Sequence, residues 1–215
     1  MANIKQLKHL EHLEDEMLNY GVEGCKAAVS FLEELRKMLG HQESSGFMQT
    51  KWDGAPSVVC GTDPNSGMFF VGTKSVFAKN SKACYDDVDV DLYYEGDLAE
   101  KLKYSLKYFS TLGIQGIVQG DLLFTTDVKR ETVNGEKLYT FTPNTITYGI
   151  PVDHPIGVAT GKAKIGVVFH THYRGNDFQT MQAVAGAKVK GSIEVLSVDN
   201  DTPMERVGLN HSDEL

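Results

Sequence analysis

Apolar side chains recur every three or four positions through the first 40 residues, which is the spacing of amphipathic helices. The pattern breaks at Gly21 and ends before Gly40, a residue type that often follows the last helical turn. We therefore expect a helical hairpin over residues 1–40, whose stripes bury each other and a sheet edge; the alternative is that they bind a partner. The stripe residues are Leu7, Leu10, Leu13 and Met17, then Cys25, Ala28, Val29, Leu32, Leu35 and Leu39.

After a polar linker at 41–46 the hydrophobic period changes from helical to extended. Strand-like runs at 47–51, 56–61 and 67–73 are separated by turn residues, and the segment 63–67 is typical of a tight hairpin loop. This change of period marks the expected start of a sheet core.

The middle of the chain combines an acidic segment with a helical pattern. The carboxylates of residues 85–97 lack the glycine-turned spacing of a calcium loop, so we expect a solvated acidic loop. Asp97, at the end of this segment, and Glu100 match a capping box. The helical stripe that follows them ends at Gly113. The apolar strand that follows ends in Asp121, which either points a carboxylate out of a buried edge or caps the next turn.

Strands and loops alternate in the remainder. Residues 137–141 and 145–150 have strand patterns, and the Pro- and Gly-rich stretch 151–162 is expected to be an exposed loop. A long apolar strand is predicted at 164–173, and the alternating segment 188–198 can add a hairpin.

Length and composition limit the architecture and the class of protein. The 215 residues suffice for one substantial core, so we expect a helical segment at 1–40 and an α+β core of mostly antiparallel sheets at 41–215. The net charge of −8 argues against a strongly basic protein that coats nucleic acid, while a local basic groove is still allowed. Three widely spaced cysteines favour a reducing, cytoplasmic setting, and no apolar run predicts export or a membrane span.

The segment 49–57 carries the candidate chemistry. Lys51 follows the apolar pair at 47–48, and an amine held among apolar neighbours loses hydration and becomes a better nucleophile. Residues two apart in an extended segment face the same side, so Asp53 can steer the lysine, and Gly54 lets the backbone turn. The sequence therefore predicts a reactive lysine.

Residues 51–54, Lys-Trp-Asp-Gly, resemble the first motif of the covalent nucleotidyltransferases, the superfamily of ATP-dependent DNA ligases, RNA ligases and mRNA capping enzymes. Two further segments follow in the family's order. Residues 69–75 are similar to the strand with a second basic-plus-small motif, and residues 118–123 to the Gly-Glu-Leu strand, with Asp121 in place of glutamate. The chain also resembles a group of uncharacterised tailed-phage proteins. This resemblance implies a location in the cytoplasm of the host cell.

The resemblance implies a ligase-type adenylation core in which Lys51 attacks the α-phosphorus of ATP and holds AMP through a phosphoramidate bond. It also implies that Asp53 orients the lysine, Lys74 meets phosphate or ribose, and Asp121 binds ribose or Mg²⁺. Nicked or broken DNA or RNA is the implied partner. The other residues implied at the nucleotide are Thr50, Trp52, Gly54, Ser57, Phe169, Lys188 and Lys190.

The chain departs from the family pattern in two places. Pro56 stands where the family carries an Arg or Asn that contacts ribose, with Ser57 one residue further on. In the strand at 165–169 an isoleucine replaces the family's glutamate, and Lys188-Val189-Lys190 follows as the segment that grips the triphosphate. A second alignment makes this strand the family's aromatic strand, with Phe169 or Tyr173 stacking on adenine and the last motifs beyond residue 215.

Two other functions stay open. A ligase-like fold can serve as a nucleotide-binding or structural module, which Pro56 and the acidic balance favour. His170 and His172, two residues apart on a strand, would point the same way and begin the metal site of a hydrolase, completed by Asp121 or Asp177. The choice between DNA and RNA, and between ATP and GTP, is also open.

Overall fold

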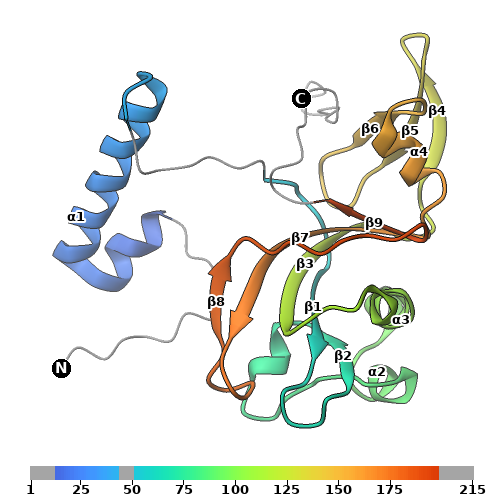
Figure 1. Cartoon of the computed structure of the whole chain (residues 1–215), viewed down its shortest axis with the longest axis horizontal. Helices are drawn as coiled ribbons and strands as arrows, with labels where there is room; N and C mark the ends of the chain where they lie inside the picture. Colours follow the sequence, from blue (N-terminus) through green and yellow to red (C-terminus); the bar gives the residue numbers. More distant parts are fainter. Residues whose placement is uncertain (1–12, 44–50, 199–215) are drawn as a thin grey trace. The chain divides into compact units, whose positions relative to one another are not determined.

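A computed structural model describes residues 13–43 and 51–198 of the chain (Figure 1). The chain divides into two compact units, a helical one within residues 9–49 and a sheet unit from residue 50 onward. Among the described residues, no helix combines the length and the apolar character needed to cross a membrane. The strand predicted at 47–51 lies outside these residues apart from Lys51, which belongs to no strand.

The helical unit is α1 (Leu13–Leu39), which is bent at Gly21. Gly21 has φ 57° and ψ −128°, a conformation that a residue without a Cβ adopts readily. The break therefore falls where the sequence predicts it, although no loop separates the two halves. A β-carbon at the buried Gly24 would collide with the carbonyl oxygen of Glu16, so the bend packs the first segment onto the second.

The sheet unit is built on a six-stranded sheet in the order β2-β1-β3-β7-β8, with β9 paired to β7. Only the β7–β9 pair is parallel, so the α+β class with mostly antiparallel strands is confirmed. The hairpin predicted at 63–67 is present, whereas that expected over 188–198 is wrong, because only residues 195–198 of this segment form a strand, and that strand pairs with β7. The strands are β1 (Ser57–Thr62), β2 (Phe69–Gly72), β3 (Ile117–Phe124), β7 (Ile165–Arg174), β8 (Gln182–Ala185) and β9 (Val195–Val198).

Helices α2 (Asp87–Tyr93) and α3 (Gly96–Phe109) pack on one face of this sheet. The acidic loop predicted there is wrong, because Asp86 caps α2 through its side chain and Val90 is buried beneath it. The capping box is wrong as well: α3 begins at Gly96, and Asp97 pairs instead with Lys101 (2.8 Å). Short 3₁₀ turns, η1 (Lys74–Phe77) and η2 (Ser110–Leu112), follow β2 and α3, and the second ends at the predicted Gly113, with φ 63°.

A second, three-stranded sheet has the order β4-β5-β6. Its strands are β4 (Lys129–Val133), β5 (Glu136–Phe141) and β6 (Tyr148–Pro151). The stretch expected to be an exposed loop contains α4 (Pro155–Thr160), which His154 caps by accepting from Ile156 N (3.2 Å). A proline at the first helical position is already suited to a helix start, and this signal outweighs the Gly-rich composition.

The two faces of the large sheet differ in polarity. On the face that carries α3, Val58 and Leu122 belong to one apolar cluster with the helix. On the other face, Ile117 and Leu123 of β3 belong to two separate apolar clusters. Between these clusters lies a strip of polar side chains, here called the polar strip: Ser57, Gln119, Asp121, His170, Thr171 and Tyr173.

Candidate functional site

The loop 51–56 crosses β3 next to Asp121. Two backbone hydrogen bonds tie it to Leu122, which accepts from Ala55 N (2.9 Å) and donates to the proline carbonyl oxygen at position 56 (3.0 Å). Gly54 lies so close to β3 that a β-carbon there would come within 2.8 Å of Asp121 Cβ. Since only glycine fits this approach, the Lys-x-Asp-Gly segment is held beside Asp121.

The second sheet holds the same loop from the other side. The backbone N–H of Asp53 donates to the hydroxyl of Tyr148 (2.6 Å), and Asn144 Nδ2 donates to Asp53 Oδ2 (3.1 Å). Trp52 is only 3 % exposed and packs on the Tyr148 ring, with centroids 5.2 Å apart. Burial raises the pKa of the Tyr148 phenol, so the hydroxyl stays protonated at neutral pH. The predicted nucleotide contact at Trp52 is therefore wrong, because the indole is used inside the protein to support the loop.

Lys51 begins the described part of the sheet unit, and its side chain is exposed. The apolar pair at 47–48 and the predicted nucleotide contact Thr50 lie outside the described residues. The shielding expected from that pair therefore falls outside the described residues and stays a prediction. Gly54, three residues after Lys51, is the part of this motif that approaches Asp121.

Asp121 lies opposite Ser57 in the pairing of β1 with β3, as a common site for the two residues requires. Gln119 Nε2 donates to Ser57 Oγ (2.7 Å), and Tyr173 OH donates to Gln119 Oε1 (2.6 Å). Burial raises the pKa of Tyr173, so this phenol remains a donor. Asp121 neither ends its strand nor caps the next turn, as the sequence pattern had suggested, because β3 continues to Phe124 and the carboxylate lies in mid-strand.

His170 is an ionisable neighbour of Asp121. Its Nε2 lies 3.4 Å from Asp121 Oδ1, and the two side chains are 21 % and 24 % exposed. The distance permits charge attraction but is longer than an ordinary N–H···O hydrogen bond, and the buried Nε2 has no hydrogen-bond partner in the described structure. Sequence reasoning noted this histidine only as half of a His-x-His pair.

The expected alignment of His170 with His172 is wrong. A register shift in β7 falls at His170, while His172 pairs with Val118 and its Nδ1 lies 2.9 Å from Gly186 O. The extra residue of a bulge changes which way the neighbouring side chain points, so the two imidazoles have different surroundings. Among the described residues, no group of three or more His, Cys, Asp or Glu side chains is placed to hold a metal ion.

Lys74 is the first residue of η1 and is exposed. Gly72, two residues earlier, pairs with Val59, and Val59 is two residues from Ser57. Lys74 therefore leaves the sheet at the same end as Ser57 and Asp121, on the opposite side of β1 from β3. The predicted cation thus lies at the same end of the sheet as Asp121, and its contact with phosphate or ribose stays a prediction.

Phe169 does not join this group, and Lys188 and Lys190 are exposed. Phe169 is 1 % exposed and meets Phe109 in an edge contact of 5.6 Å, so the predicted stacking on a base is wrong. Val189, between the two lysines, packs on the apolar cluster at the helical face, opposite the face that carries Asp121. The alternation of β7 explains why Phe169 faces the helical side of the sheet, while the triphosphate contacts predicted for the two lysines stay predictions.

Comparison with known proteins finds no match among curated proteins and none among solved structures. A family model matches residues 3–214, which is nearly the whole chain. The chain belongs to DUF6267, a family of unknown function. Membership of DUF6267 assigns no activity to the chain.

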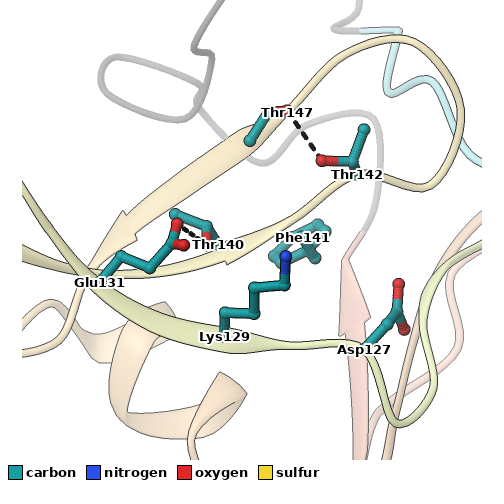
Figure 2. Close-up of a pocket in the computed structure, with 7 residues that line it drawn as sticks. All are labelled: Asp127, Lys129, Glu131, Thr140, Phe141, Thr142 and Thr147. Carbon is teal, nitrogen blue, oxygen red and sulfur yellow. Dashed lines mark hydrogen bonds between the residues drawn. The ribbon is translucent and has the colours of Figure 1, made fainter.

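A separate hollow of about 400 Å³ lies on the three-stranded sheet of this DUF6267 protein. Figure 2 shows Lys129 extending from β4 beneath Phe141, with Glu131 and Asp127 on either side. The Thr140 hydroxyl donates to Glu131 (2.7 Å). No residue predicted for the nucleotide site lines this hollow, which is formed by Asp127, Lys129, Glu131, Thr140, Phe141, Thr142 and Thr147.

Proposed function

We propose that this protein is a covalent nucleotidyltransferase that takes AMP from ATP onto Lys51 and passes it to a nucleic acid end. The observation that carries the proposal is the contact between Gly54 and Asp121. Two segments far apart in the sequence, each resembling a motif of that superfamily, thereby lie at one place. Ser57 opposite Asp121, and Lys74 at the same end of the sheet, add a hydroxyl and a cation.

The first step is a nucleotidyl transfer. The neutral Lys51 amine attacks the α-phosphorus, so an N–P bond forms as the P–O bond to the β-phosphate breaks, pyrophosphate leaves and the amine proton passes to solvent. Such reactions depend mostly on positioning and on neutralising phosphate charge. Asp53 is suited to orienting the amine because Tyr148 and Asn144 fix its backbone and one carboxylate oxygen.

Mg²⁺ fits the donor set of this site. The ion prefers oxygen ligands and is usually bound by one or two carboxylates together with substrate phosphates. Asp121 supplies one carboxylate, and Asp53 lies next to the glycine that packs on it. When bound, the ion would neutralise charge on the triphosphate.

Intact-protein mass spectrometry after incubation with ATP and Mg²⁺ tests this proposal. We expect one added AMP on the wild type and none on Lys51→Arg, which keeps the charge but is a poor nucleophile. Lys129→Arg, on the separate hollow, is the matched control and should keep the adduct. An unmodified wild type, or an adduct that persists in Lys51→Arg, would contradict the proposal. Nicked duplex DNA and RNA, added to the adenylated protein, then identify the acceptor.

The exposure of Lys51 and the proline at position 56 favour a second candidate, a ligase-like module that binds nucleotide without transfer. Such a protein would be stabilised by ATP, by about 2.7 kcal/mol at 100 times the dissociation constant, and would gain no mass. Thermal unfolding with and without ATP, run beside the mass measurement, separates the two functions.

A further inference from the structure

His170 is an extra residue in the pairing of β7 with β3. Gln119 pairs with Thr171 and Gly120 pairs with Phe169, so His170 has no partner of its own in the register. This irregularity turns its imidazole toward Asp121 on the polar strip, where Nε2 lies 3.4 Å from Asp121 Oδ1. Irregular pairing next to a candidate site is a common means of aiming one side chain.

The imidazole is oriented by its second nitrogen. His170 Nδ1 lies 2.8 Å from the hydroxyl oxygen of Thr171, a residue that is only 2 % exposed. When this hydroxyl donates to Nδ1, the ring proton is on Nε2, the nitrogen that faces Asp121. In that tautomer His170 Nε2–H is a donor to the carboxylate, whereas a Thr171 hydroxyl that accepts from Nδ1–H would leave Nε2 as an acceptor.

Other polar groups of the strip satisfy one another. Gln119 donates to Ser57 and accepts from Tyr173, so both ends of its amide are engaged. His170 Nε2 is buried without a hydrogen bond in the described structure, and a small movement of either side chain would shorten 3.4 Å to bonding distance.

We propose that His170 is a positioning residue for Asp121. Its Nε2–H bonds Oδ1 when nucleotide binds, which fixes the plane of the carboxylate and leaves Oδ2 directed to the ligand. This inference rests on the proposed nucleotidyl transfer and adds to it a residue for which the resemblance gave no role. Groups that orient a ligand-binding side chain typically contribute 10- to 100-fold to affinity or activity.

Three substitutions test which nitrogen matters. His170→Gln keeps an N–H near the position of Nε2, His170→Asn keeps one near Nδ1, and His170→Ala keeps neither. We expect the rate of lysyl-AMP formation to fall about 10- to 100-fold in the Ala and Asn variants and to be largely restored in the Gln variant. His172→Gln and His172→Ala, on the same strand with a different partner, are matched controls and should react like the wild type.

Nitrogen NMR of the imidazoles gives a readout that needs neither activity nor a His170 variant. We expect the wild type to show the Nε2–H tautomer of His170, and Asp121→Asn to shift that nitrogen resonance while leaving that of His172 in place. Equal rates for His170→Ala and wild type, equal rescue by Asn and Gln, or an Nδ1–H tautomer would each overturn the inference. A wild type that forms no adduct would remove the proposed function, and the spectra would still decide whether His170 holds Asp121.

Discussion

The hydroxyl of Tyr148 accepts a hydrogen bond of 2.6 Å from the backbone N–H of Asp53, 95 residues earlier in the chain. Tyr148 belongs to the three-stranded sheet, whereas Asp53 lies on the loop that crosses the six-stranded sheet. One bond therefore connects the second sheet to the segment that carries the reactive lysine of the proposed reaction.

Removing this hydroxyl should weaken both the fold and the site. Tyr148→Phe keeps the ring contact with Trp52 but leaves the Asp53 N–H without its acceptor, which costs about 1 to 3 kcal/mol when the group cannot reach water. We expect a lower urea midpoint and slower adduct formation. Asn144→Ala, which removes the more exposed bond to Asp53, should change stability by less than about 0.5 kcal/mol. A Phe variant as stable as the wild type would show that this bond does not join the sheets.

A side chain at position 54 should separate the loop from Asp121. In Gly54→Ala the new methyl group would meet both Asp121 Cβ and Leu122 O at 2.8 Å, and backbone cannot move aside as a flexible side chain can. Overpacking of this kind costs about 1 to 3 kcal/mol. We expect a lower melting temperature and loss of most adduct formation when the rate is measured well below melting. Full activity in this variant would contradict the role given to the Gly54–Asp121 contact.

Asp63 should make the protein less stable in acid. This carboxylate is 5 % exposed, and burial opposes its ionisation, but hydrogen bonds from Ser66, Asn65 and Tyr85 hold its pKa below the usual range. Because its pKa is lower in the folded state, its contribution is complete above the unfolded value of about 3.9 and is lost as pH falls through the folded value. Asp63→Asn should therefore be destabilised at pH 7, with the difference from wild type narrowing below about pH 4.

Urea unfolding of wild type and Asp63→Asn at pH 7 and pH 3 measures this effect. Asp97→Asn is the control, because the Asp97 side chain is 80 % exposed and its ion pair with Lys101 should contribute less than about 1 kcal/mol. If the difference in the free energy of unfolding between wild type and Asp63→Asn were the same at both pH values, the ionised Asp63 carboxylate would not be the cause of that difference.

The three cysteines should react at very different rates. Cys25 is exposed, whereas burial raises the pKa of Cys84 to about 12, with help from nearby Asp89, and burial also raises the pKa of Cys60. Since the thiolate is the reactive form, a thiol reagent at pH 8 should label one cysteine quickly in the native protein and the other two only after denaturation. Cys25→Ser should abolish the fast phase; two fast thiols in the wild type would mean that the sheet core opens readily.

Local sequence patterns predicted the parts of the fold that local physics determines. The strand runs that became β1, β2, β3 and β7 alternate or are continuously apolar because they are buried on one or both faces. The break at Gly21 and the stop at Gly113 follow from backbone conformations suited to glycine. By contrast, α2 was predicted as a loop because its carboxylates outnumber the single buried residue, Val90, that anchors it.

Residues of the candidate site could be predicted only where they belong to a recognisable sequence motif. Gly54 and Ser57 both lie beside Asp121, and Asp53 precedes Gly54 in the chain, while their role at a nucleotide stays a prediction. Tyr148 carries no local signal, because a tyrosine at a strand start is usual, and its role depends on a partner 95 residues away. His170 was misjudged because a register shift depends on how the neighbouring strand pairs, and the sequence of β7 alone does not contain that information.

The shared hold on the loop 51–56 links substitutions that are distant in sequence. Tyr148 of the three-stranded sheet and Asn144 in the turn before it form hydrogen bonds to this loop. On the six-stranded sheet, the loop packs against β3 at Gly54. The distance between the Asp53 and Asp121 carboxylates therefore depends on contacts from both sheets. A change in the turn before β6 would move these two acids relative to each other, although the turn itself takes no part in the proposed reaction. Relatives that differ in this turn should therefore differ in the rate of adduct formation even where the residues around the lysine are the same.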